Sequence, residues 1–169
     1  IPACMVLWVC VWFWAATSKL NQHFPSVIMV MMNNGPFFPK ILKKRLFKSY
    51  PDNLRPSRFA ELMAHFGTTT EYLIAILLIT STDPTLTWVM LCVASSFHGF
   101  IALNNPSGMP IEWNILMVYG GFFLFGFHPE ASVLAVGSMP LLAVFLFVCL
   151  FAIPCFGNFV PSRVSFLMA

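Results

Sequence analysis

The sequence predicts an all-α fold, a polytopic integral membrane helical bundle of about five transmembrane helices. Three observations support this prediction. Charged residues make up 9% of the chain, against about 25% in a typical soluble domain. The 169 residues include 19 Phe and 5 Trp, which is more apolar surface than a core of this size buries, so the surplus must face lipid. The long segments are apolar throughout, whereas barrel strands would alternate apolar and polar residues.

Turn and cap signals divide the chain into five predicted spans. They lie at about residues 2–18, 57–81, 84–103, 110–127 and 129–153. The best-marked start is the third, where Asp83 can cap the helix and Pro84 can occupy its first turn. We expect the fifth span to be kinked at Pro140 and to end near Pro154, because proline interrupts helical hydrogen bonding.

Residues 1–169 are predicted to form a single transmembrane domain that is a fragment of a longer chain. The sequence opens at Ile1 without an initiator Met and stops in the apolar run "SFLMA". The five Cys show no CxxC or other metal spacing. We expect them to act as small apolar residues and to form no disulfide framework.

Positive charge is concentrated in one segment. Seven of the nine basic residues lie between Lys40 and Arg58. If the five spans alternate sides, this cluster, Lys19 and Arg163 all fall on one face of the membrane, and short basic loops mark the cytoplasmic face. We therefore expect a basic cytoplasmic loop at residues 19–56 that contacts anionic lipids, in a bacterial cytoplasmic membrane. A single basic loop predicts no nucleic-acid partner.

Ionisable and amide side chains near the membrane are the candidates for a site, because such groups are costly in lipid. Glu61 and His65 are four residues apart, so they share a helix face and with Lys19 are the candidate catalytic groups. The candidate ligand-binding residues are His23, Glu71, His98, Asn104, Asn105 and Glu112.

These candidates allow two interpretations. Glu61, His65 and His98 can meet in one polar chamber near the cytoplasmic side, joined by Asn104 or Glu112, since their heights along adjacent helices match. Alternatively, each side chain lies separately in the headgroup zone. Glu71 is different, because "YLIAILLI" follows it and a carboxylate there needs a partner, a proton or a water-filled cavity.

Cofactor and packing motifs are sparse. The His residues lack a local metal spacing, so no metal site is predicted. Ala94 and His98 are spaced like a pigment-binding motif, which leaves a tetrapyrrole as a possible ligand of His98; otherwise no cofactor is predicted. The small residues expected to allow close helix packing are Gly120, Gly121, Ala135, Gly137 and Ser138.

The runs "SKLNQHFP", "NNGPFFPK", "RLFKSYPDNLRPSRFAELMAHFGTTTEYL" and "NNPSGMPIEWNILMVYGG" carry a resemblance. Across about residues 15–127 the chain resembles a family of bacterial multi-spanning transmembrane proteins of unknown function. It is more remotely similar to the horizontally transferred transmembrane domain shared with vitamin K-dependent carboxylases. No motif of that domain matches residue by residue, so the resemblance implies no catalytic role.

Three functions remain open at this point. The first is an accessory or scaffold subunit, whose aromatic-rich helices contact membrane lipids and partner subunits of a larger membrane complex. The second is a membrane enzyme or carrier for a hydrophobic substrate such as a lipid, quinone or isoprenoid, held in the polar chamber with Glu61 and His65 as an acid–base pair. The third is pigment or haem binding through His98.

Overall fold

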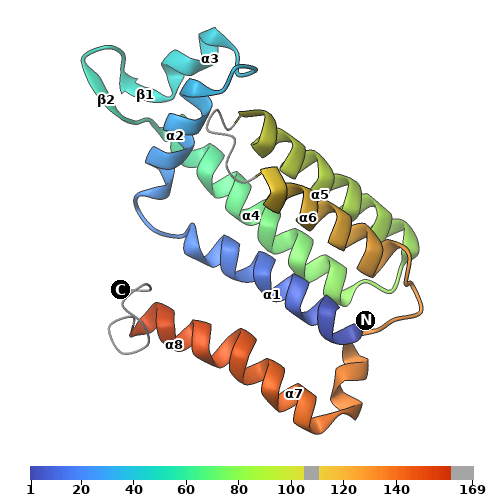
Figure 1. Ribbon diagram of the computed structural model, residues 1–169. Helices are drawn as coiled ribbons and strands as arrows, with labels where there is room; N and C mark the ends of the chain where they lie inside the picture. The colour runs from blue at the N-terminus through green and yellow to red at the C-terminus, as the bar shows by residue number, and fades with distance from the viewer. Residues whose placement is uncertain (105–110, 161–169) are drawn as a thin grey trace.

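Four helices lie side by side at the centre of the computed structural model, which describes residues 1–104 and 111–160 (Figure 1). They are α1 (Pro2–Ser18), α4 (Arg58–Thr80), α5 (Pro84–Asn104) and α6 (Ile111–Gly121). A π-helical turn, η1 (Phe122–Gly126), extends α6. The helices α1 and α4 run antiparallel, so the end of α1 lies partway along α4.

The predicted start signals work as expected at two helices. Ser57 caps α4, because its side-chain oxygen accepts a hydrogen bond from the backbone N–H of Ala60. Asp83 Oδ1 accepts a hydrogen bond from the backbone N–H of Thr85 at 2.9 Å, and Pro84 is the first residue of α5. These local bonds satisfy backbone donors that an α-helix leaves free at its N-terminus.

The length and composition of three helices suit a membrane span. Within the described residues these are Arg58–Thr80, Pro84–Asn104 and Pro140–Phe159. Two shorter apolar helices, Pro2–Ser18 and Ile111–Gly126, accompany them. The helical membrane fold is therefore confirmed, whereas the predicted number of five spans is not.

The C-terminal segment corrects the predicted fifth span. Residues 129–153 do not form one helix, because a short 3₁₀ helix, η2 (Val133–Ser138), precedes the long helix. The long helix runs through α7 (Pro140–Phe147), the π-helical η3 (Val148–Ala152) and α8 (Ile153–Phe159). Pro140 opens this helix instead of kinking it, and Pro154 lies inside it. The wider π turn lies directly before Pro154, where proline disturbs the α-helical bonding.

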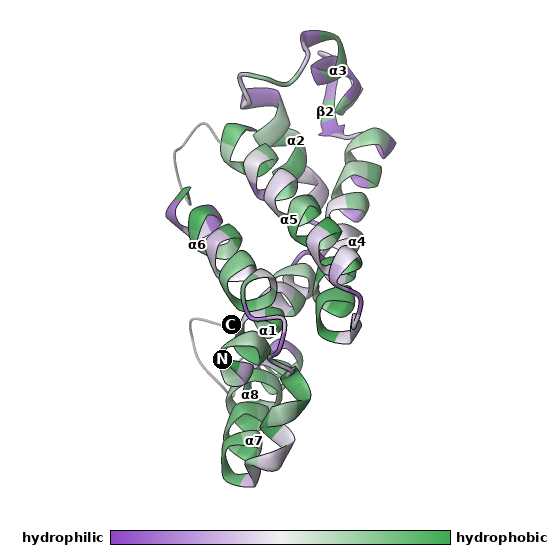
Figure 2. Ribbon diagram, turned by 90° about the vertical axis from the view of Figure 1, so that its right-hand side faces the viewer, coloured by the Kyte–Doolittle hydropathy of each residue, from purple (hydrophilic) through white to green (hydrophobic). Residues whose placement is uncertain are grey.

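The basic segment is folded, not an open loop. It contains α2 (Phe24–Asn34), α3 (Lys40–Arg45) and the antiparallel strands β1 (Phe47–Ser49) and β2 (Asn53–Pro56). Met32, Leu46 and Ala60 form a small core that joins this segment to the start of α4. Figure 2 shows hydrophilic residues gathered around α3 and β2. We call this end of the bundle the basic end.

The main core combines large and small side chains. Trp8 and Trp12 of α1 pack with residues of α4, α5 and α6, including Leu78, Leu91 and Met117. Trp8 Nε1 donates a hydrogen bond to the backbone carbonyl of Met117 at 3.2 Å. The indole polar group is therefore satisfied inside the bundle, as expected of a buried Trp.

Candidate functional site

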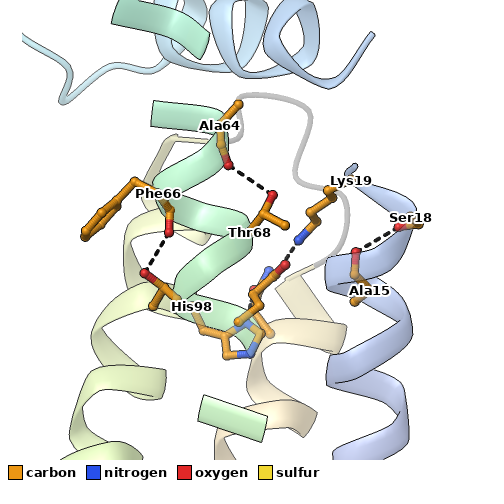
Figure 3. A network of polar contacts seen from close by, with 10 residues as sticks. Ala15, Ser18, Lys19, Ala64, Phe66, Thr68 and His98 are labelled. Carbon is orange, nitrogen blue, oxygen red and sulfur yellow. Dashed lines mark hydrogen bonds and ion pairs between the residues drawn. The ribbon is translucent and has the colours of Figure 1, made fainter. Parts of the chain in front are cut away.

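An ion pair joins α1 to α4 in the interior of the molecule. The Lys19 ammonium donates to Glu71 Oε1 (Figure 3). The Glu71 side chain is 5% exposed and that of Lys19 is 23% exposed. Glu71 follows Arg58 by 13 residues, which is about 20 Å along a helix. A carboxylate at this depth has the partner that its burial requires.

Helical spacing explains why these two residues meet. Met5, Trp8, Trp12 and Ala16 are buried along one side of α1, and Lys19 continues that row one turn further on. On α4 the buried row contains small or polar residues: Ala60, Ala64, Thr68, Glu71 and Ala75. Small side chains allow the helices to approach closely. The Thr68 hydroxyl donates a hydrogen bond to the backbone carbonyl of Ala64 at 3.0 Å, so its proton is not available to the ion pair.

A second polar contact links α5 to α6. His98 Nδ1 lies 2.6 Å from Asn114 Oδ1, and both residues are buried. With the amide oxygen as the acceptor, Nδ1 is the donor of this hydrogen bond. The ring of Trp12 meets that of His98 edge-on, with their centroids 4.9 Å apart. Figure 3 shows the side chains of Lys19, Thr68 and His98 directed into the same region between the helices.

Several buried polar atoms have no hydrogen-bond partner among residues 1–104 and 111–160. They are Trp12 Nε1, Glu71 Oε2, His98 Nε2 and Asn104 Oδ1. Each such group costs roughly 1–3 kcal/mol. Unsatisfied buried groups are few in native proteins and call for an explanation, such as a functional role. Glu71 and His98 make the two polar contacts just described, and Trp12 packs against the His98 ring, which makes this cluster the candidate site.

An apolar groove lies beside the ion pair. It has a volume of about 500 Å³ and is bounded by α2, α4 and α5, within the range of about 300–1,000 Å³ typical of ligand pockets. Its rim includes the exposed side chains Val27, Phe66 and Phe100. Lys19 also lines the groove, and its Nζ lies 5.7 Å from the centroid of the Phe24 ring. The apolar groove is thus lined at one point by Lys19, a member of the ion pair.

The predicted chamber of Glu61, His65 and His98 is not assembled. Glu61 and His65 are exposed on α4 and make no side-chain hydrogen bond or ion pair within the described parts of the chain. Glu61 and His65 directly follow the buried residues Ala60 and Ala64. Successive residues on a helix point about 100° apart, so Glu61 and His65 lie outside the buried row. His98 instead lies beside Trp12 and Asn114.

The other predicted ligand-binding residues divide into three groups. Asn104 is buried at the end of α5, where its Nδ2 donates to the carbonyl of Phe100 at 2.9 Å. Glu112 and His23 are exposed, and His23 lies at the start of α2 without a capping side-chain bond. Asn105 lies outside the described residues.

The sequence interpretation missed the pairing of Lys19 with Glu71 and the contact of Trp12 and Asn114 with His98. A signal for the pair exists: Trp12, Ala16 and Lys19 are spaced by four and three residues, as are Ala64, Thr68 and Glu71. Two such rows on antiparallel neighbours place the charges opposite each other. Asn114 carries no comparable signal, because its contact depends on how α6 is rotated.

The surroundings of the candidate metal and pigment ligands can be described as follows. The described residues contain no group of three or more His, Cys, Asp or Glu side chains that could hold a metal ion. His98 Nε2 is buried, and the rings of Trp12 and Phe97 lie beside the imidazole.

Comparison with known proteins identifies a family. No curated protein and no solved structure matches the chain significantly. The family described as "Transmembrane protein of unknown function (DUF3556)" matches residues 1–169. With three helices suited to a membrane span and a family match over the whole chain, this protein belongs to that family of transmembrane proteins.

Proposed function

We propose that this protein binds a long-chain hydrophobic substrate, such as a lipid, quinone or isoprenoid, inside the membrane, as a carrier or a membrane enzyme. The observation that supports the proposal is the apolar groove of about 500 Å³ that Lys19 lines at the ion pair. An apolar cavity with few polar groups at one place is the usual form of a small-molecule site.

The break between α1 and α2 supports the same proposal. The helix α1 ends at Ser18 and a separate helix, α2, begins at Phe24; Lys19, in the segment between them, donates to Glu71. Non-helical backbone next to charged groups is found in transporters where it lines the binding site. The groups available for acid–base chemistry in this region are Lys19, Glu71 and His98, in place of Glu61 and His65.

A matched pair of substitutions at Gly67 tests the proposal. Gly67 lines the groove on α4, and a Cβ there would meet Phe97 Cε2 at 3.7 Å, which is an ordinary contact. Gly67→Ala therefore preserves the groove and stabilises α4 by roughly 0.5–1 kcal/mol. Gly67→Leu fills the groove while remaining a good helix former.

The measurement is photo-cross-linking with hexadecanol that carries a diazirine on its chain, followed by mass spectrometry of the labelled peptides. We expect labelling of groove residues of α2, α4 and α5 that excess hexadecanol suppresses in the wild type and in Gly67→Ala, and that Gly67→Leu abolishes. Equal, unsuppressed labelling in all three proteins would overturn the proposal, because it would reflect general contact with lipid.

We also propose an accessory or scaffold role through the helix Pro140–Phe159. Gly157 is the one buried residue of this helix, and large apolar side chains such as Leu141 and Phe147 are exposed. Such a surface fits lipid or the apolar helix of a partner subunit. Purification in mild detergent tests this second proposal: a stoichiometric partner supports it, and a lone monomer opposes it.

We infer that the basic end faces the cytoplasm of a bacterial cell. Lys40, Lys44, Arg45, Lys48, Arg55 and Arg58 are exposed there, and the opposite end carries Asp83 and Glu130. Exposed Ile41 and Leu54 accompany the basic residues, as expected of a surface that contacts anionic headgroups. In a cysteine-free background, Lys44→Cys should react with an impermeant maleimide only after lysis, whereas Glu130→Cys should react in intact cells; the reverse pattern would refute this orientation.

A further inference from the structure

We propose that the ligand of the groove carries a neutral oxygen-containing head, such as an alcohol, ester or ketone, and not an ionised acid. This inference rests on the proposed function and specifies the substrate class for the same groove. Two properties of the groove lead to it: which hydrogen-bond donors remain available, and what net charge surrounds them.

The available donors come from Lys19. The other polar side chains that line the groove are Thr70 and Ser96. Thr70 donates to the carbonyl of Phe66 at 2.9 Å, and Ser96 donates to the carbonyl of Cys92 at 2.9 Å. Their hydroxyl hydrogens are thus engaged by the helix backbone. An ammonium group has three N–H donors, and one of those on Lys19 goes to Glu71, which leaves two for an acceptor in the groove.

The charge at this point is balanced before a ligand enters. The Lys19 ammonium and the Glu71 carboxylate form a neutral pair, and among the described lining residues of the groove Lys19 is the one ionisable side chain. A carboxylate or phosphate head would add an uncompensated negative charge in an apolar surrounding, which costs several kcal/mol. A neutral oxygen accepts the Lys19 N–H bonds without that cost.

The orientation of the ligand follows from the walls. The remaining lining residues are apolar or lack a polar side chain: Phe24, Val27, Ile28, Met31, Met32, Met63, Phe66, Gly67, Val93, Phe97, Phe100 and Ile101. The chain of the ligand therefore lies along α2, α4 and α5, and its head reaches Lys19. Unbranched Met side chains adapt to different chain shapes, so the head should determine selectivity more than the tail.

Competition against the photoactive hexadecanol probe tests this inference. Methyl palmitate and hexadecanol should each displace the probe from the wild-type protein at concentrations at least about tenfold below that of palmitate at pH 8, the ratio that corresponds to 1.4 kcal/mol. Palmitate that competes as well as its methyl ester would overturn the inference while leaving the groove as a ligand site. A probe that none of the three displaces would instead contradict the proposed function.

Glu71→Gln provides a second, independent test. The substitution removes the negative partner and leaves the Lys19 cation, so the preference should shift by at least about tenfold toward palmitate. Glu61→Gln, on the exposed side of the same helix, is the matched control and should keep the wild-type preference. An unchanged preference in Glu71→Gln would refute the electrostatic argument. If that variant does not fold, the wild-type comparison of ester with acid still decides the question.

Discussion

The helices α4 and Pro140–Phe159 are both suited to a membrane span, yet they are built in opposite ways. On α4, small and polar residues such as Ala64, Thr68 and Glu71 are buried, and large apolar residues such as Phe66 are exposed. On Pro140–Phe159 the residues are mostly apolar (Figure 2), and Gly157 is the one that is buried. In a membrane, a helix can bury a charge only where neighbours compensate it, whereas a helix at the periphery must be apolar all round.

The largest expected effect comes from removing the positive charge of Lys19, which compensates the buried Glu71 on α4. Lys19→Met leaves the Glu71 carboxylate buried and unpaired, which should destabilise the protein by roughly 3–5 kcal/mol. Glu71→Met should cost less, because the longer, partly exposed Lys19 side chain can reach a more polar region. The double variant should recover most of the loss. Denaturation in detergent measures these differences, with the exposed Lys44→Met as a control; a loss below about 1 kcal/mol in Lys19→Met would mean that the pair contributes little.

Introducing a charge on the peripheral helix should have the next largest effect. Phe147 is 60% exposed, and its replacement by Lys places an ammonium in lipid with no acid beside it. The expected cost of insertion is about 2.5–3.5 kcal/mol near a helix centre. The fraction of chains inserted in a translation–membrane assay reports it, with Phe147→Leu as the matched control. Normal insertion of Phe147→Lys would indicate that this helix lies against water or a polar partner.

A smaller effect on stability is expected from adding a methyl group at a closely packed glycine of the bundle, compared with an open glycine near the C-terminal helix. A Cβ at Gly121 would lie 3.0 Å from Trp8 Cζ2 and 3.3 Å from Leu91 Cδ2, whereas a Cβ at Gly137 would meet no atom within 4 Å. Gly121→Ala should therefore destabilise the bundle by about 1–3 kcal/mol. Gly137→Ala should have no destabilising effect. Melting temperatures of the two variants check the contrast, and equal values would refute it.

The smallest effect is expected at the exposed turn before η2. Hydrogen bonds from its own backbone N–H and from His128 lower the pKa of the Glu130 carboxyl below its ordinary value of 4.5. A lowered pKa in the folded state stabilises the fold above the unfolded pKa, and this contribution is lost as the pH falls through the folded value. Glu130→Gln should therefore melt slightly below wild type at pH 7 and equal to it at low pH. Melting temperatures of the two proteins at pH 7 and at low pH check this difference, and an equal gap at both pH values would contradict it.

The spans and their caps could be predicted well where the signal is local. Ser57, Asp83 and Pro84 begin their helices in the structure because a cap depends on a few adjacent residues. The fifth span was placed wrongly because a proline can either open or interrupt a helix: Pro140 opens the helix that it was expected to kink, and Pro154 lies inside the helix that it was expected to end. Gly120 and Gly121 pack closely as predicted, but Ala135, Gly137 and Ser138 are exposed, since a small residue allows contact without requiring it.

The amino-acid sequence by itself determined that this protein lies in a lipid bilayer, because this follows from its composition and from the length of its apolar segments. It also determined the depth of each polar group along its own helix, since the rise per residue is constant. Only the tertiary structure decided the partners. The rotation of α4 turns Glu71 inward and leaves Glu61 and His65 exposed, and the rotations of α5 and α6 bring His98 to Asn114. Those rotations are set by side chains packing across several helices at once, so no single segment contains the information.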